Sequence, residues 1–364
     1  MAKSLNPLLQ IGRWLCLAPL VLAACTGSGG PGTTGSKADA TAISVDAGLS
    51  ERAPDALVAD AVRAADTGPL ATPDAAGNRD LPQPDAGAGD GTGGVFVPPM
   101  PSVGTDSTLM DMTDFGTSQG FKIILDYRYD TTQSMTRDKR LVLRTAAASW
   151  EQFIASDFAP VPAGTYIRAR DPENMDAGGS NFTVTYPIDD LVIFLGMASI
   201  YNASGDTLGE ATSSKTTLGM TADLAAVLNG RYNGNPFQPW VATVAFDKDN
   251  ALFVDATMDT SDDIPSDQND FYSVAMHEFG HVLGMGSSLA YQALVVDATF
   301  TGAHAVAVYG APVPLASDSI HVLNTVIVDG RQVVMARYDV AGTRSLITRL
   351  DLAMLEDLGY IIRR

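Results

Sequence analysis

The chain has 364 residues and a formal net charge of −19, with 42 acidic against 23 basic side chains. Domains usually contain about 100 to 200 residues, so this length allows two or three of them if the whole chain folds. The acidic excess excludes nucleic acid as a partner and an anionic membrane surface as a docking site, because both are negatively charged.

An export signal is expected at the start of the chain. Lys3 and Arg13 supply its positive charge, and the apolar run over residues 14–24 is too short for a permanent membrane-spanning helix. The run ends in LAAC, which resembles the bacterial lipobox, where the peptide is cut before the cysteine and the new terminus carries a lipid. This resemblance implies a signal peptide over residues 1–24 and lipidation of Cys25. A plain secretory signal is the alternative, and both exclude a cytoplasmic protein.

Two residues near the lipobox bear on destination and stability. Thr26 stands where an aspartate commonly retains lipoproteins at the inner membrane, so we expect a lipid anchor at the outer membrane or cell surface. Cys16 lies inside the signal, so the exported chain keeps at most one thiol and can form no internal disulfide. A packed core must therefore stabilise the fold, with help from a metal if one is bound.

A segment of low complexity follows over residues 25–117. Ala, Gly, Asp, Pro, Ser and Thr dominate it, and it contains almost no aromatic residues. Such a segment cannot bury enough apolar surface to offset the entropy that it would lose on ordering. We predict a disordered linker between the lipid and the folded part, with room for a short helix around residues 53–65.

The composition changes near residue 121, which predicts a single folded domain over residues 118–364. Residues 121–129 alternate apolar and polar side chains as a strand does, and residues 137–158 show helical spacing. Two more strands are expected at residues 182–185 and 191–195. The second is an unbroken apolar run, which is typical of a central strand.

The middle of the domain is less regular. Residues 199–240 are rich in Gly, Asn, Ser and Thr and are expected to form a long surface excursion. Residues 241–246 and 251–253 are expected to form a pair of strands. The acidic stretch over residues 255–270 could bind Ca²⁺, although its spacing matches no EF-hand, and a solvated loop is the alternative.

The most informative motif is His277-Glu278-x-x-His281, inside an apolar helical run. Residues four apart on a helix lie one turn above each other, about 6 Å along the axis, so both imidazoles can bind one metal ion. Glu278 can then hold a zinc-bound water and take its proton as the water attacks a peptide carbonyl. The alternative is a chance pattern on an amphipathic helix. Gly284 allows the left-handed turn that ends this helix, so that a third ligand can approach.

The motif is similar to that of the metzincin zinc metallopeptidases. Many metzincins place their third ligand three residues after the glycine, where this chain has Ser287, a poor zinc ligand. The chain more closely resembles leishmanolysin-like and related exported bacterial metallopeptidases, in which an insertion precedes the third histidine. The resemblance covers about residues 121–360 and is strongest at DFYSVAMHEFGHVLGMG and TRLDLAMLEDLGY.

This resemblance implies an α+β zincin domain with a twisted mixed sheet, an active-site helix and a small C-terminal subdomain that ends in a helix. It also implies that His321 is the third Zn²⁺ ligand and that Met335 forms a methionine turn beneath the metal. His304 and Asp318 compete for the place of third ligand, and His321 could instead be an ordinary loop histidine. Tyr338 could line the site or stabilise an oxyanion.

The last helix is expected from the residues alone. Thr348-Arg-Leu-Asp351 has the form of a capping box, and Leu350, Met354 and Leu358 then fall on one face. We expect this helix to close the lower half of the domain.

The sequence thus predicts a zinc metalloendopeptidase that hydrolyses extracytoplasmic polypeptides, with Glu278 as general base. One alternative is a non-catalytic surface-binding lipoprotein that retains the fold, and another is a zinc hydrolase with other substrates. Glu278 argues against the first, because a purely structural zinc site has no use for a carboxylate beside an open coordination position.

Overall fold

The protein is described by a computed structural model at residues 60–64 and 111–363, apart from residues 177–178, 201–206, 214–219 and 259. All of these residues belong to one unit that spans Ala53–Arg364. The expected signal peptide, Cys25 and most of the expected linker lie outside the described residues.

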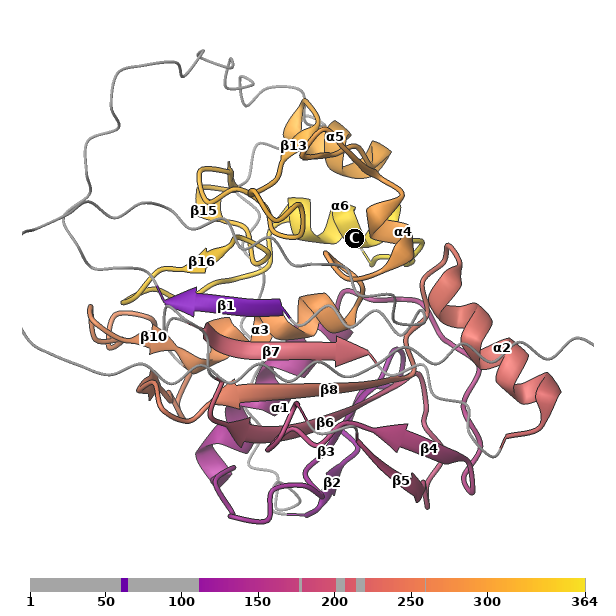
Figure 1. Cartoon of the computed structure of the whole chain (residues 1–364). Coiled ribbons are helices and arrows are strands. Elements are labelled where there is room, and N and C mark those ends of the chain that lie inside the picture. The colour runs from indigo at the N-terminus through magenta and orange to yellow at the C-terminus, as the bar shows by residue number, and fades with distance from the viewer. Residues whose placement is uncertain are drawn as a thin grey trace, which may run out of the picture. The chain divides into compact units, whose positions relative to one another are not determined.

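A mixed sheet of seven strands forms the framework, in the order β16-β1-β7-β8-β6-β3-β2 (Figure 1). Its centre is formed by β3 (Ile123–Asp126), β6 (Leu191–Ala198) and β8 (Val241–Asp247), which run parallel to one another and are buried at every residue. Complete burial is typical of strands that are covered on both faces, and it explains the unbroken apolar run in β6. On the far side of β8, β7 (Thr207–Ser213) runs antiparallel to it.

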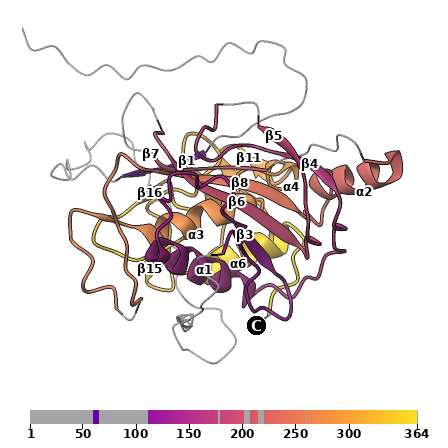
Figure 2. The ribbon, with the colours of Figure 1, turned by 90° about the horizontal axis from the view of Figure 1, so that it is seen from below.

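Two helices pack side by side against one face of this sheet, α1 (Arg137–Glu151) and α3 (Phe271–Val282) (Figure 2). Trp150 of α1 is fully buried, and its indole N–H donates to the carbonyl oxygen of Met276 in α3 at 3.2 Å. The hydroxyl groups of Ser149 and Tyr272 lie 2.7 Å apart in the same interface. These contacts hold α3 against α1. A hairpin of β4 (Tyr166–Ala169) and β5 (Ser180–Thr183) also contacts β8.

The chain after α3 forms a smaller, irregular part. It contains α4 (Leu289–Gln292), α5 (Ala303–Tyr309) and α6 (Arg349–Asp357). It also contains a three-stranded sheet of β11 (Val295–Val296), β12 (Thr299–Phe300) and β13 (Val313–Pro314), and a pair of strands, β14 (Ile327–Val328) and β15 (Arg331–Gln332). The predicted capping box is confirmed, because Thr348 and Asp351 cap α6 reciprocally. The α+β fold with a mixed sheet and a C-terminal helix is therefore as predicted.

The structure differs from the sequence-based expectations in the middle of the domain. The expected surface excursion at residues 199–240 contains β7 and α2 (Ala222–Asn233). The expected pair at 241–253 does not form, because β8 pairs with β6 and β7, whereas β9 (Leu252–Phe253) pairs with β10 (Asn269–Asp270). The hairpin was predicted because the two segments are close in sequence, but each of them pairs with a strand that lies elsewhere in the chain.

The N-terminal boundary also differs. β2 (Thr113–Asp114) and β1 (Asp60–Ala64) both precede residue 118, the expected start of the domain. Instead of the short helix allowed around residues 53–65, β1 joins the sheet between β7 and β16 (Tyr338–Asp339). Backbone hydrogen bonds to two strands can order a segment that has little apolar surface of its own. Among the described residues, every helix is too short or too polar to cross a membrane.

Candidate active site

The HExxH motif lies on α3, whose ends are both defined by specific residues. Asp270 caps the N-terminus, where its carboxylate accepts a hydrogen bond from the backbone N–H of Ser273 at 3.2 Å. Gly284 follows the C-terminus with φ at +106°, a value that side chains with a Cβ rarely adopt. A Cβ at Gly284 would also lie 2.5 Å from the ring of Phe237. The chain can therefore turn sharply away from the helix only at glycine.

Three histidines converge at α3, as the spacing and the family resemblance led us to expect. The ligand atoms of His277, His281 and His321 all lie within 4.8 Å of one another, and all three side chains are buried. Within α3, the Nε2 atoms of His277 and His281 are 2.9 Å apart. His321 reaches them from the loop before Val322, which pairs with the segment around Met335.

The opposite nitrogen of each ring is held by an acceptor. Nδ1 of His277 lies 2.8 Å from the carbonyl oxygen of Val334, and Nδ1 of His281 lies 2.8 Å from that of Met285. A carbonyl oxygen can only accept, so both Nδ1 atoms carry the proton and their Nε2 atoms present lone pairs. Two such lone pairs at 2.9 Å repel each other unless a cation or a proton lies between them.

Asp318, one competing candidate for third ligand, lies behind His321 and not beside the other histidines. Its Oδ2 is 3.0 Å from Nδ1 of His321, and its Oδ1 accepts hydrogen bonds from the backbone N–H groups of Ile320 and His321. Burial opposes the charge of Asp318, but its hydrogen bonds with His321 and the backbone lower its pKa to about 2. Asp318 thus orients His321, a function that the i, i+3 spacing could have suggested.

His304, the other competitor, is not part of this cluster. It lies on α5 with its side chain 53% exposed, and its Nδ1 is 3.7 Å from a carboxylate oxygen of Glu356. The structure therefore separates His304 from the three converging histidines.

Glu278 is fully buried between α3 and β7. A Cβ at Gly209 of β7 would lie 2.6 Å from its Oε1 and 2.8 Å from its Cγ, so the strand passes directly against the carboxylate. Sequence reasoning missed this strand, because TLGEATS has neither strong alternation nor an apolar run.

Met335 lies beneath α3, where the resemblance implies a methionine turn. It is fully buried, and its sulfur would lie 2.4 Å from a Cβ at Gly280, the residue before His281. Asp351 of α6 stabilises this turn, because its carboxylate accepts a hydrogen bond from the backbone N–H of Val334 at 3.1 Å. The carbonyl of Val334 in turn accepts from His277, so the capping box of α6 is connected to the metal-facing ring.

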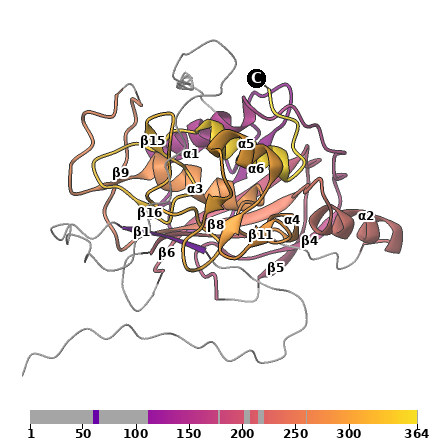
Figure 3. The same cartoon turned by 90° about the horizontal axis from the view of Figure 1, so that it is seen from above.

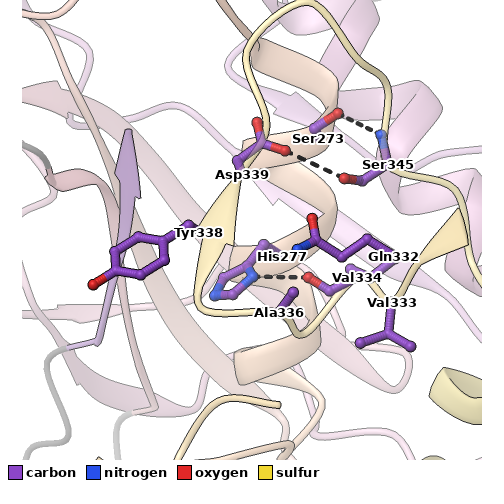
Figure 4. A pocket seen from close by; sticks show the side chains of 9 residues that line it. All are labelled: Ser273, His277, Gln332, Val333, Val334, Ala336, Tyr338, Asp339 and Ser345. Atoms are coloured by element: carbon purple, nitrogen blue, oxygen red, sulfur yellow. Dashed lines mark hydrogen bonds between the residues drawn. The ribbon is translucent and has the colours of Figure 1, made fainter. Parts of the chain in front are cut away.

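A small pocket lies beside His277, between α3 and the segment that contains Met335 (Figure 4). Its lining includes Ser273, Gln332, Tyr338, Asp339 and Ser345. Burial, and to a lesser degree the negative charge of Asp270, raise the pKa of Asp339 to about 8. The hydroxyl of Tyr338 points away from the His277 ring, which argues against a role in oxyanion stabilisation.

The acidic stretch considered for Ca²⁺ begins at a buried ion pair. Arg344 contacts Asp255 at 2.8 Å and Asp270 at 3.1 Å, and all three side chains are almost fully buried. Within the described part of the chain, the two groups spaced to hold a metal are the three histidines and Asp157, Asp189 and Asp190. Neither group includes residues 255–270, so calcium binding there stays a prediction.

The donor set fits zinc. Three imidazoles suit Zn²⁺, and a catalytic zinc site usually has three protein ligands and keeps a fourth position open. Hydrogen bonds to the rear nitrogens are also typical of zinc-binding histidines, because they fix the tautomer and the ring orientation.

Comparison with known proteins agrees with this assignment at the level of the protein class. A family model described as Matrixin matches residues 228–306, a region that contains all of α3. This match supports a metzincin-type zinc metallopeptidase. Among curated proteins, none matches the chain.

Proposed function

We propose that the chain is a zinc metalloendopeptidase that hydrolyses polypeptides outside the cytoplasm. The observation that carries the proposal is the convergence of three buried histidines at the helix that also carries the buried Glu278. The Nδ1 atom of each of these histidines makes a hydrogen bond. His277, His281 and His321 would hold Zn²⁺ through their Nε2 atoms.

The residues of the chain have distinct roles in this reaction. When bound, zinc lowers the pKa of a coordinated water towards about 7 and polarises the substrate carbonyl. Glu278 removes a proton from the attacking water and delivers it to the leaving amine. Its neighbour Gly209 leaves room for the carboxylate at the sheet edge. Asp318, Met285 and Val334 hold the three rings in orientation, which reduces the reorganisation needed at each turnover.

The likeness to leishmanolysin-like peptidases belongs to the same proposal. Gly284 and His321 are separated by a stretch that folds into α4, β11 to β13 and α5, and the chain then returns to the site. This arrangement supports a third ligand supplied after an insertion.

A non-catalytic surface-binding lipoprotein is the alternative. A structural zinc site normally has four protein ligands, whereas among the described residues three histidines form this cluster. The open position and the adjacent Glu278 favour turnover over a purely structural site.

The test is zinc content and casein cleavage for the purified chain and three variants. Glu278→Gln should keep one zinc per chain and lose cleavage by at least about a hundredfold, since general-base catalysis contributes about 10²–10⁴-fold. His321→Ala should lose most of both. His304→Ala is the matched control and should keep both, because this exposed histidine lies outside the cluster. Full activity in His321→Ala or Glu278→Gln would refute the proposal.

We further propose attachment to the cell envelope through a lipid on Cys25, at the outer membrane or cell surface. Its support is the LAAC sequence and the apolar run before it. Cys25→Ala should move the protein from the membrane fraction of the cell to the soluble fraction. Unchanged membrane association of this variant would argue for another means of attachment.

A further inference from the structure

The pocket beside His277 is formed by two parts of the chain. The segment that contains β15 and β16 lies over α3 in Figure 1 and in the view from above (Figure 3). α3 contributes Ser273 and His277 to the lining, and the segment contributes Gln332 of β15 and Asp339 of β16. His277 is thus a wall of the pocket as well as a proposed metal ligand.

A substrate side chain next to the scissile bond comes within reach of this pocket. Hydrolysis requires the carbonyl of the scissile bond to lie at the metal that His277 would hold. Successive residues of an extended chain are about 3.3 Å apart, so the side chain beside that carbonyl lies close to the imidazole of His277. The lining of the pocket can therefore influence which polypeptides are cleaved.

The pocket is small, with room for about one water molecule. Gln332 reaches into it from β15, and its amide group lies between His277 and the side chains of Asp339 and Ser345 (Figure 4). A serine or threonine side chain can place its Cβ at the mouth of the pocket and its hydroxyl where the water would lie. A leucine or phenylalanine side chain needs more space than Gln332 leaves.

The lining also offers acceptors for a hydrogen bond. Nε2 of Gln332 donates to the carbonyl oxygen of Asn324 at 3.3 Å. Because a carbonyl oxygen can only accept, this bond fixes the orientation of the amide, and Oε1 faces Asp339 and Ser345 (Figure 4). The hydroxyl of Ser345 donates its proton to Asp339 at 3.2 Å and keeps its oxygen as an acceptor. A hydroxyl in the pocket therefore meets two oxygens to which it can donate.

We propose that the pocket beside His277 receives the substrate side chain next to the scissile bond, and that Gln332 makes the enzyme selective for serine or threonine at that position. This inference rests on the proposed peptidase function. Gln332 acts in two ways, because its side chain limits the space and its Oε1 accepts a hydrogen bond from the substrate hydroxyl. A site of this kind discriminates against a side chain without a hydroxyl, since its own polar groups then stay buried without that partner.

Cleavage of fluorescein-labelled peptides tests this selectivity. The peptides are short and alanine-rich and differ at a single residue, which is Ser, Thr or Leu, and mass spectrometry identifies cleavage beside it. In the parent chain, kcat/KM should be at least about tenfold higher with Ser or Thr than with Leu. Gln332→Ala opens the space and removes the acceptor, so it should lower this ratio at least about tenfold. Gln332→Met keeps the length of the side chain, so it should reduce cleavage of the Ser peptide without improving cleavage of the Leu peptide.

Gln292→Ala is the matched control, because Gln292 is an exposed glutamine at the end of α4 that does not line the pocket. It should keep the ratio of the parent chain. A parent chain that prefers Leu, or the same ratio in Gln332→Ala as in Gln292→Ala, would overturn the inference.

Peptide binding tests the pocket without relying on catalysis. In Glu278→Gln, fluorescence anisotropy gives the Kd of each peptide, and the Ser peptide should bind at least about fivefold more tightly than the Leu peptide. Adding Gln332→Ala should abolish this difference. Equal affinity for the three peptides, or no measurable binding of any, would count against the inference. If the Kd values follow the prediction but the zinc-loaded parent chain cleaves no peptide, the pocket selects the side chain and it is the peptidase function that fails.

Discussion

The carboxylate of Asp318 accepts a hydrogen bond from Nδ1 of His321 at 3.0 Å, on the side of the ring that faces away from the other two histidines. This pair predicts the effect of neutralising the carboxylate. Asp318→Asn should lower the zinc affinity about 10-fold to 100-fold, because such partners orient the ligand and raise its basicity. A chelator competition measures this, with Asp263→Asn as a control at an exposed acidic residue. An unchanged affinity would show that Asp318 does not support the metal site.

Gly209 gives a prediction for the general base. In Gly209→Ala, the new Cβ would lie 2.6 Å from Oε1 of Glu278, so the carboxylate must move. A displacement of about 1 Å in a catalytic group can cost about 10²-fold, and we expect a loss of kcat of about 10-fold to 100-fold with zinc content unchanged. Gly230→Ala is the control, since a Cβ at Gly230 on α2 meets nothing within 4 Å. Equal rates for both variants would place Glu278 outside the reaction.

Arg344 gives a prediction for stability. Its guanidinium pairs with Asp255 and Asp270, and the three side chains are at most 3% exposed. Arg344→Met would leave buried carboxylates without their cation and should lower the free energy of unfolding by about 3–5 kcal/mol. Lys122→Met removes a pair with Asp189 in which both side chains are partly exposed, and it should cost at most about 1 kcal/mol. Urea denaturation compares the two, and similar losses would contradict this account.

Asp339 predicts a pH dependence of stability. Burial and the charge of Asp270 raise its pKa in the folded protein to about 8 from 3.8. Between these values the unfolded chain ionises while the folded protein keeps the proton, so stability should fall as the pH rises from about 4 to about 8. Asp339→Asn, which stays neutral, should make the free energy of unfolding less dependent on pH in that range. Identical slopes in the two proteins would show that Asp339 is ionised in the fold.

The elements that were predicted from the sequence are those whose signals are local. The apolar run of β6, the helical spacing of α3 and the capping box at Thr348 and Asp351 each depend on residues close together in the chain. The same holds for the pairing of His277 with His281, because a spacing of four on a helix places both rings on one face. His321 is different, since no local pattern marks it and the expectation came from a family resemblance.

The features that sequence reasoning missed depend on contacts between distant segments. β7 has few apolar residues and is stabilised by pairing with β8, so its position against Glu278 could not be inferred from periodicity. β1 lies in a stretch whose composition indicates disorder, and it pairs through its backbone with residues that follow it by more than 140 positions. The composition of a segment indicates how much entropy is lost when the segment becomes ordered. It does not indicate whether the fold contains two strands with which the segment can pair.

The backbone N–H of Val334 donates to Asp351, and Nδ1 of His277 donates to the carbonyl oxygen of Val334, so the last helix supports the orientation of His277. Asp351 belongs to the last helix. The hydrogen bonds that orient His277 can therefore form only when synthesis of the chain is nearly finished. In the proposed peptidase, we therefore expect incomplete chains and C-terminally truncated chains to have little activity.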